Sequence, residues 1–233
     1  MKKRLSIYYW LRKIFVSKYI QFFIYKKTFL RKIFFYLIYK SNHWNKYIES
    51  DKNDLMVSGP GSIPGSPQTK NVITNLNEFI KNNDIKNVLD MPCGDFAWMK
   101  ELLKINNKLD YTGYDIVKDI IDINNKKYSS DKIRFILKDI INEKNFNNFD
   151  LIFVRDFFIH INNKDINKVL TAIKNSKIKF FACSNYNEEA FNNDVVVGQH
   201  RKINLSIKPF NLKNVFHNFP ENKNDKYLNF YKI

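Results

Sequence analysis

Residues 88–98 read Val88-Leu-Asp-Met-Pro-Cys-Gly-Asp-Phe-Ala-Trp98. The apolar residues that lead to Asp90 predict a short buried strand, and Pro92 with Gly94 predicts a tight turn after it. From residue 96 to residue 103 the apolar residues have helical spacing. A strand that passes through a tight turn into a helix exposes backbone amides to a ligand. This strand–turn–helix unit decides the fold class.

The same alternation of strand and helix continues toward residue 183. Short apolar runs predict strands at 87–89, 111–114, 134–137, 151–154 and 179–183. Helical spacing predicts helices within 72–80, 96–103, 116–123 and 166–173. Such alternation predicts an α/β fold, a mostly parallel sheet with helices on both faces. Ligands of these sheets bind beyond the carboxyl ends of the strands.

Acidic residues stand where the first three predicted strands end. Asp90 ends the first strand, and Asp115 ends the second, 21 residues after Gly94. That spacing suits a carboxylate that accepts hydrogen bonds from ribose hydroxyls. Asp139 follows the third strand, where it could accept from an adenine amino group. Each alone is commonly a helix cap or turn former, but their order favours a nucleotide-type site.

The fourth predicted strand ends in a cluster of ionisable residues. Asp156 and His160 are candidate general bases, and Arg155 and Arg201 are candidate clamps for an anionic acceptor. If Asp156 starts a helix, His160 lies four residues later on its face. If the strand continues, Arg155 and Asp156 point to opposite sides. The alternatives are a packing role for His160 and a structural ion pair for Arg155.

Together these motifs resemble class I S-adenosylmethionine-dependent methyltransferases. Their first motif is an acidic residue followed by Gly-x-Gly-x-Gly, from which this chain departs because Pro92 and Phe96 replace two glycines. The chain also resembles a bacterial branch of that superfamily with a D-x-P-C-G-D-F-x-W motif. The other motifs of this branch are matched by Ser58–Ser62 with Gln68 and Thr69, by Arg155, Asp156 and His160, and by Arg201, Asn204, Leu205, Pro209 and Phe210.

The resemblance implies a Rossmann-like, mostly parallel seven-stranded sheet that binds S-adenosylmethionine. Asp90 and Gly94 would frame the methionine end, Asp115 the ribose and Asp139 the adenine. NAD is the natural competitor, but Asp95 would repel its phosphates, whereas S-adenosylmethionine has a cationic sulfonium and no phosphate. The cofactor-binding residues expected are Asp90, Pro92, Gly94, Asp95, Phe96, Asp115, Ile116, Asp139, Ile140, Arg155, Ser62 and Gln68.

The formal charge of +16 is concentrated at the N-terminus. Residues 1–48 hold twelve Lys or Arg and fifteen aromatic residues, with no acid before Glu49, which leaves +4 for the rest. We therefore expect a basic aromatic helical segment at 1–48, a linker and Gly/Pro/Ser loop at 49–70, and a catalytic domain at 71–233. The segment would contact an anionic membrane surface, or pack as a helical pair on its own domain or on a second subunit.

Neither secretion nor membrane insertion is expected. The chain opens with MKKR, as signal peptides do, but its longest uninterrupted apolar run, Ile33–Tyr39, is far short of the ~20 residues that cross a bilayer. Cys93 and Cys183 have the spacing of neither a disulfide framework nor a zinc site. We expect a cytoplasmic protein without a bound metal, peripheral at the inner membrane face if residues 1–48 bind lipid.

The sequence predicts an O-methyltransferase for a small sugar, a nucleotide sugar or a surface-glycan intermediate of capsule or lipopolysaccharide. An RNA methyltransferase is the first alternative, since cations interleaved with aromatic residues also suit single-stranded RNA. Nucleic acid is the weaker candidate because the domain beyond residue 48 is nearly balanced in charge. A non-catalytic partner protein with a methyltransferase fold is the second alternative, and the oligomeric state stays open.

Overall fold

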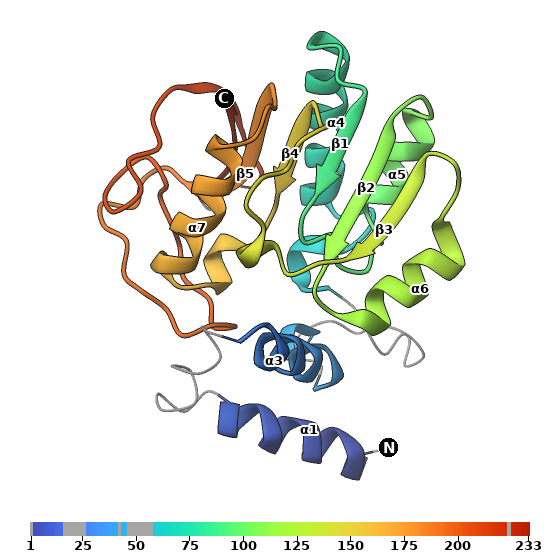
Figure 1. Cartoon of the computed structure of the whole chain (residues 1–233), viewed down its shortest axis with the longest axis vertical. Coiled ribbons are helices and arrows are strands. Elements are labelled where there is room, and N and C mark those ends of the chain that lie inside the picture. Colours follow the sequence, from blue (N-terminus) through green and yellow to red (C-terminus); the bar gives the residue numbers. More distant parts are fainter. Residues whose placement is uncertain (1, 16–26, 42, 46–57, 223–224) are drawn as a thin grey trace.

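The computed structural model describes residues 2–15, 27–41, 43–45, 58–222 and 225–233. At its centre is a seven-stranded sheet in the order β3-β2-β1-β4-β5-β7-β6 (Figure 1). The first five strands are mutually parallel, and β7 runs antiparallel to β5 and β6. The predicted fold class is thereby confirmed. The strands are β1 (Asn87–Asp90), β2 (Asp110–Asp115), β3 (Ile133–Leu137), β4 (Leu151–Val154), β5 (Phe180–Tyr186), β6 (Val215–Pro220) and β7 (Lys226–Lys232).

Four helices accompany the strands: α4 (Pro67–Asn82), α5 (Met99–Ile105), α6 (Lys118–Tyr128) and α7 (Asn163–Lys174). The Ser66 hydroxyl caps α4, so this helix begins inside the stretch expected to be a loop and carries Gln68 in its first turn. Helix α5 begins at Met99 rather than at Phe96, because Phe96 has a φ of 60° that a right-handed helix does not accommodate. Short 3-10 helices lie at 43–45, 60–62, 140–142 and 158–160.

Two hydrophobic layers enclose the central strands. Val88 packs with α4 and α5 on one side of the sheet, whereas its neighbour Leu89 packs with α7 and with α3 (Thr28–Lys40) on the other. Phe153 and Ile152 of β4 divide between the same two layers. Strands that are covered on both faces consist of unbroken apolar runs, which is why these central strands could be predicted from the sequence.

The N-terminal helix α3 belongs to the core of the sheet domain. It lies across the carboxyl edge of the sheet, and α1 (Lys2–Phe15) packs on its outer side (Figure 1). Phe34 and Ile38 are buried, and Gly198 approaches them so closely that a Cβ there would lie 2.6 Å from one and 2.7 Å from the other. Arg31 is fully buried in an ion pair with Asp139. The described N-terminal helices thus pack on their own domain.

The strand order positions a ligand site. It reverses between β1 and β4, whose connections leave in opposite directions and open a crevice at their carboxyl ends. Helix α3 and the loop that begins at Ser58 close over this crevice (Figure 1). Within the described ranges, no helix is both long and apolar enough to cross a bilayer.

Candidate functional site

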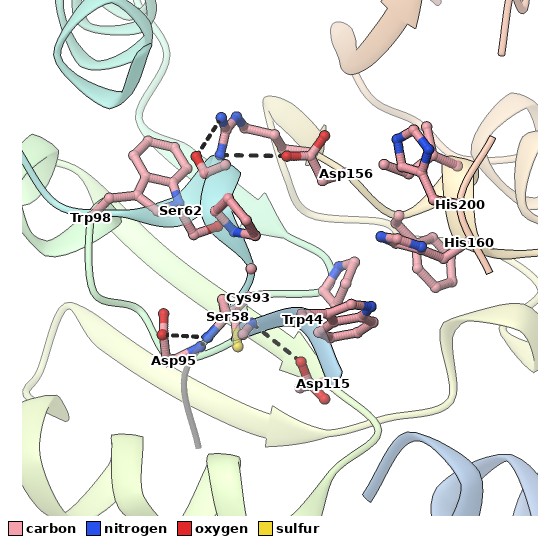
Figure 2. A pocket seen from close by; sticks show the side chains of 18 of the residues that line it. Trp44, Ser58, Ser62, Cys93, Asp95, Trp98, Asp115, Asp156, His160 and His200 are labelled. Carbon is pink, nitrogen blue, oxygen red and sulfur yellow. Dashed lines mark hydrogen bonds and ion pairs between the residues drawn. The ribbon is translucent and has the colours of Figure 1, made fainter. Parts of the chain in front are cut away.

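A cavity of about 570 Å³ lies at the crevice between β1 and β4 (Figure 2). Its walls come from α3 and the following 43–45 turn, from the 58–62 loop, from the ends of β1, β2 and β4, and from the start of β7. Small-molecule sites commonly measure ~300–1,000 Å³. The cavity therefore has room for a nucleoside-sized cofactor and a small second ligand.

One end of the cavity is built on the Gly94 turn. Gly94 has a φ of 55°, and a Cβ there would lie 2.5 Å from Ser58 Oγ. The Ser58 amide donates to the Asp95 carboxylate over 2.7 Å, and the Asp95 amide donates to Ser58 Oγ over 3.2 Å (Figure 2). These reciprocal bonds hold the 58–62 loop against the turn, so both motifs form one wall.

Two further carboxyl groups are buried beside this turn. Asp115 accepts from the amides of Gly94 (3.2 Å) and Val117 (2.9 Å), and burial raises its pKa to about 6. Asp90 accepts from the Tyr111 hydroxyl over 2.8 Å, and burial raises its pKa to about 7. Buried carboxylates become easier to ionise when a cation binds near them. This end of the cavity suits a positively charged ligand.

The Arg155 guanidinium is held by the protein itself. Its Nε donates to the Glu221 carboxylate over 2.9 Å, and its Nη2 donates to the Gly61 carbonyl over 2.8 Å. Glu221 is fully buried and also accepts from Gln68 over 3.1 Å. Arg155 lines the cavity but acts here as the structural ion pair that joins β4, the 58–62 loop and the β6–β7 connection.

Asp156 follows β4 with a φ of 57°, a strained backbone conformation that tends to occur at functional sites. Lys226 Nζ lies 2.6 Å from its carboxylate and 3.1 Å from that of Glu221. Burial disfavours the Asp156 charge, but Lys226 and Arg155 outweigh it and lower its pKa below the ordinary value. Asp156 is therefore a fixed, ion-paired carboxylate and a weak proton acceptor.

His160 occupies the 158–160 turn at the opposite end of the cavity from Asp95 (Figure 2). Its ring lies 5.2 Å from the Trp44 ring, and its Nδ1 lies 3.0 Å from the Gln199 carbonyl oxygen. Since a carbonyl only accepts, Nδ1 carries the proton and Nε2 carries a lone pair. Burial lowers the pKa of His160 to about 4, so the ring is neutral at physiological pH. A neutral imidazole with an unprotonated Nε2 can accept a proton.

The structure places the expected site residues in two groups. Most of them line the cavity: Asp90, Pro92, Gly94, Asp95, Asp115, Ile116, Ser62, Gln68, Arg155, Asp156 and His160. Phe96, Asp139, Ile140 and Arg201 lie outside its lining.

Each of the four has a structural reason to lie elsewhere. The Asp139 carboxylate is engaged by Arg31 and by Thr28 Oγ1 at 2.7 Å, so α3 occupies the side on which adenine was expected. Arg201 donates to the Ile161 carbonyl over 2.8 Å and fastens its own loop to the 158–160 turn. Phe96 and Ile140 are buried in the two hydrophobic layers.

Several lining residues had no sequence signal of a site. Tyr39 and Trp44 come from the basic aromatic segment, where no one aromatic residue stands out. Lys226 lies at the start of β7, beyond the predicted strands. All three reach the cavity through tertiary packing, which spacing along the chain does not reveal.

The family described as "Methyltransferase domain" matches residues 88–176. That stretch contains the Gly94 turn, Asp115 and the cluster from Arg155 to His160. Residues 88–176 therefore carry a methyltransferase domain, which supports the class I S-adenosylmethionine-dependent superfamily that the motifs resemble. S-adenosylmethionine is the cofactor of this methyltransferase, and the acidic end of the cavity fits its sulfonium cation. A comparison with curated proteins found none that matches in sequence.

Several solved structures are similar to this chain at low sequence identity. A mitomycin 7-O-methyltransferase is 11% identical with a TM-score of 0.53, over 69% of this chain and 54% of that one. A protein of Haemophilus influenzae described as a methylase is 14% identical with a TM-score of 0.49, over 71% and 98%. The methyltransferase domain of a bacterial Hen1 protein is 16% identical with a TM-score of 0.46, over 52% and 68%.

Proposed function

We propose that this methyltransferase methylates a hydroxyl oxygen of a small sugar, a nucleotide sugar or a surface-glycan intermediate such as one of capsule or lipopolysaccharide. The observation that carries the proposal is the His160 ring, neutral and with its Nε2 lone pair available, set in the cavity wall against Trp44. A hydroxyl acceptor must lose a proton during transfer, and a positioned imidazole can accept it.

The acidic end of the cavity is the proposed cofactor site. The Gly94 turn offers backbone close to a ligand, and Asp90 and Asp115 supply the buried negative charge. When bound, S-adenosylmethionine supplies an electrophilic methyl group on a cationic sulfur. Ser62 and Gln68 line the same cavity from the 58–62 loop and the first turn of α4. Holding the two reactants in line accounts for much of the rate of such a displacement.

The other end of the cavity is the proposed acceptor site. Trp44 and His200 supply flat faces there, and Asp156 supplies a fixed polar group (Figure 2). Tyr186 adds a third aromatic ring to the lining. A site with aromatic walls and a few placed polar groups suits a sugar ring, which has both apolar faces and hydroxyls. Trp44 and α3 cover the site, so the acceptor is a small molecule or the exposed end of a longer glycan.

His160 acts in this scheme as a general base of low pKa. Its Nδ1–H bond to Gln199 fixes the ring orientation, and the low pKa keeps Nε2 unprotonated at neutral pH. A weak base suffices if the hydroxyl proton leaves late, after the new carbon–oxygen bond has begun to form. Catalysis then depends mainly on alignment, with His160 receiving the proton.

Transfer of a labelled methyl group tests the proposal. The full chain is incubated with labelled S-adenosylmethionine and fractionated extract of the source cells, followed by nuclease or mild acid. We expect label that resists nuclease and is released by acid with the sugar fraction. Nuclease-sensitive label would replace the proposal with an RNA acceptor. A catalytically competent protein that labels only polypeptide would also contradict it.

A further inference from the structure

Helix α1 presents an apolar face that nothing in the described part of the chain covers. Ile7, Trp10 and Ile14 are 59%, 60% and 55% exposed, and Leu11 is 40% exposed. Positions 7, 10, 11 and 14 follow the i, i+3, i+4, i+7 spacing of one helical face. Four large apolar side chains thus form a continuous stripe on the outer surface of the described part of the chain, which we call the α1 stripe.

The α1 stripe is held outward by contacts on a different side of the helix. The Tyr8 ring meets the Tyr36 ring of α3 at 6.4 Å, edge to face, and Arg12 Nη1 lies 3.5 Å from His43 Nε2. Residues 8 and 12 are one turn apart and face the protein together. Helix α1 is therefore anchored on α3 and on the 43–45 turn in an orientation that leaves the stripe uncovered by the other described residues.

The surroundings of the α1 stripe are cationic. Lys13 is exposed, and its Nζ lies 4.9 Å from the centres of both the Tyr9 and the Trp10 rings. The first turn of α1 holds no acid, and residues 1–48 carry twelve Lys or Arg and no acid. Apolar side chains beside Trp and Lys are the pattern of helices that lie in a membrane interface.

We propose that the α1 stripe docks this methyltransferase on an anionic lipid surface, with the helix lying in the plane of the headgroups. Cations bring the segment to the surface, and the stripe then buries apolar area in the headgroup boundary. A second copy of the chain is disfavoured as the occupant because two segments of like charge would face each other. The proposal concerns binding alone and does not depend on the identity of the methyl acceptor.

Docking through α1 would turn the cavity toward the membrane. Helix α3 lies between α1 and the carboxyl edge of the sheet, so α1 and the cavity are at the same end of the molecule (Figure 1). If the proposed function holds, docking would hold the cavity close to an acceptor carried on a membrane lipid. This gives a physical reason for joining a basic amphipathic helix to a small-acceptor enzyme.

Vesicle flotation of the full-length protein tests the proposal. The vesicles contain two parts phosphatidylcholine to one part phosphatidylglycerol, or phosphatidylcholine alone. The variant Trp10→Ser/Ile14→Ser removes two residues of the stripe. The matched control Ile105→Ser/Phe191→Ser removes two other apolar residues that are 56% and 70% exposed. Neither pair lines the cavity, so each variant should keep the rise in melting temperature caused by S-adenosylhomocysteine.

We expect the wild type and the control to float with the anionic vesicles and to stay behind with the neutral ones. The Trp10→Ser/Ile14→Ser variant should bind the anionic vesicles on the order of tenfold more weakly. Wild-type protein that ignores anionic vesicles, or a stripe variant that binds as the wild type does, would overturn the proposal. The proposal would also be overturned if the wild type did not bind lipid but formed a dimer or bound RNA, and if the stripe variant lost that dimer or that RNA.

Discussion

At the residue scale, the chemistry of the cavity depends on the protonation states of its buried aspartates. Burial places the pKa of Asp115 at about 6 and that of Asp90 at about 7, both above the ordinary value for an aspartate. In the folded protein, Asp90 and Asp115 therefore take up protons as the pH falls from about 7 to about 6. In the unfolded chain the same two carboxylates would still be ionised over that range. A cationic ligand at this end competes with those protons.

The affinity for S-adenosylmethionine should therefore fall as the pH is lowered from 8 to 5. Protonating Asp115 and Asp90 removes the negative charge that faces the sulfonium. S-adenosylhomocysteine lacks that positive charge and should lose less affinity over the same range. Calorimetric titration of both ligands at several pH values measures the difference. Identical pH dependence for the two would show that the buried carboxylates do not face the sulfonium.

His160→Gln should lower kcat by on the order of 10²-fold and leave the KM for S-adenosylmethionine near its wild-type value, because only the proton acceptor is lost. The matched control is His217→Gln, an exposed histidine on β6 outside the cavity lining. The wild-type kcat should not change between pH 6 and pH 8, since burial lowers the pKa of His160 to about 4. A His160→Gln rate equal to that of the control would remove His160 from the mechanism.

At the element scale, the Gly198 loop shows how tightly α3 docks on the domain. Gly198 and Gly65 both have a positive φ, 83° and 75°, so alanine should cost about 1 kcal/mol of backbone strain at either. At Gly198 the new Cβ would also strike Phe34 and Ile38, whereas at Gly65 nothing lies within 4 Å. We expect Gly198→Ala to destabilise by about 1–3 kcal/mol more than Gly65→Ala. Equal losses in urea unfolding would mean that α3 is loosely held.

The sequence anticipated the elements better than their contacts. Strands β1, β2, β3 and β4 were predicted within about a residue of their observed ends, and the two central ones, β1 and β4, are buried on both faces. Strand β6 was not recognised, since it lies at the sheet edge and has mostly exposed residues. Strand β7 was not recognised either, although most of its residues are buried. That omission also hid Lys226. Helix α3 was expected as an amphipathic segment, but spacing alone did not reveal its burial against Gly198.

The candidate site was predictable where it rests on strand ends. Asp90, Asp115 and Asp156 meet in one cavity because the carboxyl ends of parallel strands share one edge of the sheet. Asp139 also follows the end of a parallel strand, but its carboxylate is hydrogen-bonded by Arg31, 108 residues earlier in the chain. Pairings over such separations depend on the packed fold, and neither motif nor spacing predicts them.

For the whole molecule, the two N-terminal helices should contribute unequally to folding. A chain that begins at residue 27 loses α1 and keeps α3, so it should unfold cooperatively and bind S-adenosylhomocysteine. A chain that begins at residue 46 also loses the buried Phe34, Phe35, Ile38 and Tyr39. At ~1.5–3 kcal/mol each, these side chains approach the ~5–15 kcal/mol by which a domain is stable. Calorimetric melting distinguishes the two, and a cooperative transition in the shorter chain would contradict the account.

Binding of S-adenosylmethionine to the full-length protein, measured by isothermal titration calorimetry at pH 8, tests the central claim most directly. The wild type and the control Asp122→Ala, a substitution on the exposed side of α6, should bind one equivalent of the cofactor. Asp115→Ala should bind at least about 1.4 kcal/mol more weakly, a tenfold change, while still melting cooperatively. Equal affinity in all three proteins would show that the acidic end of this cavity is not the cofactor site.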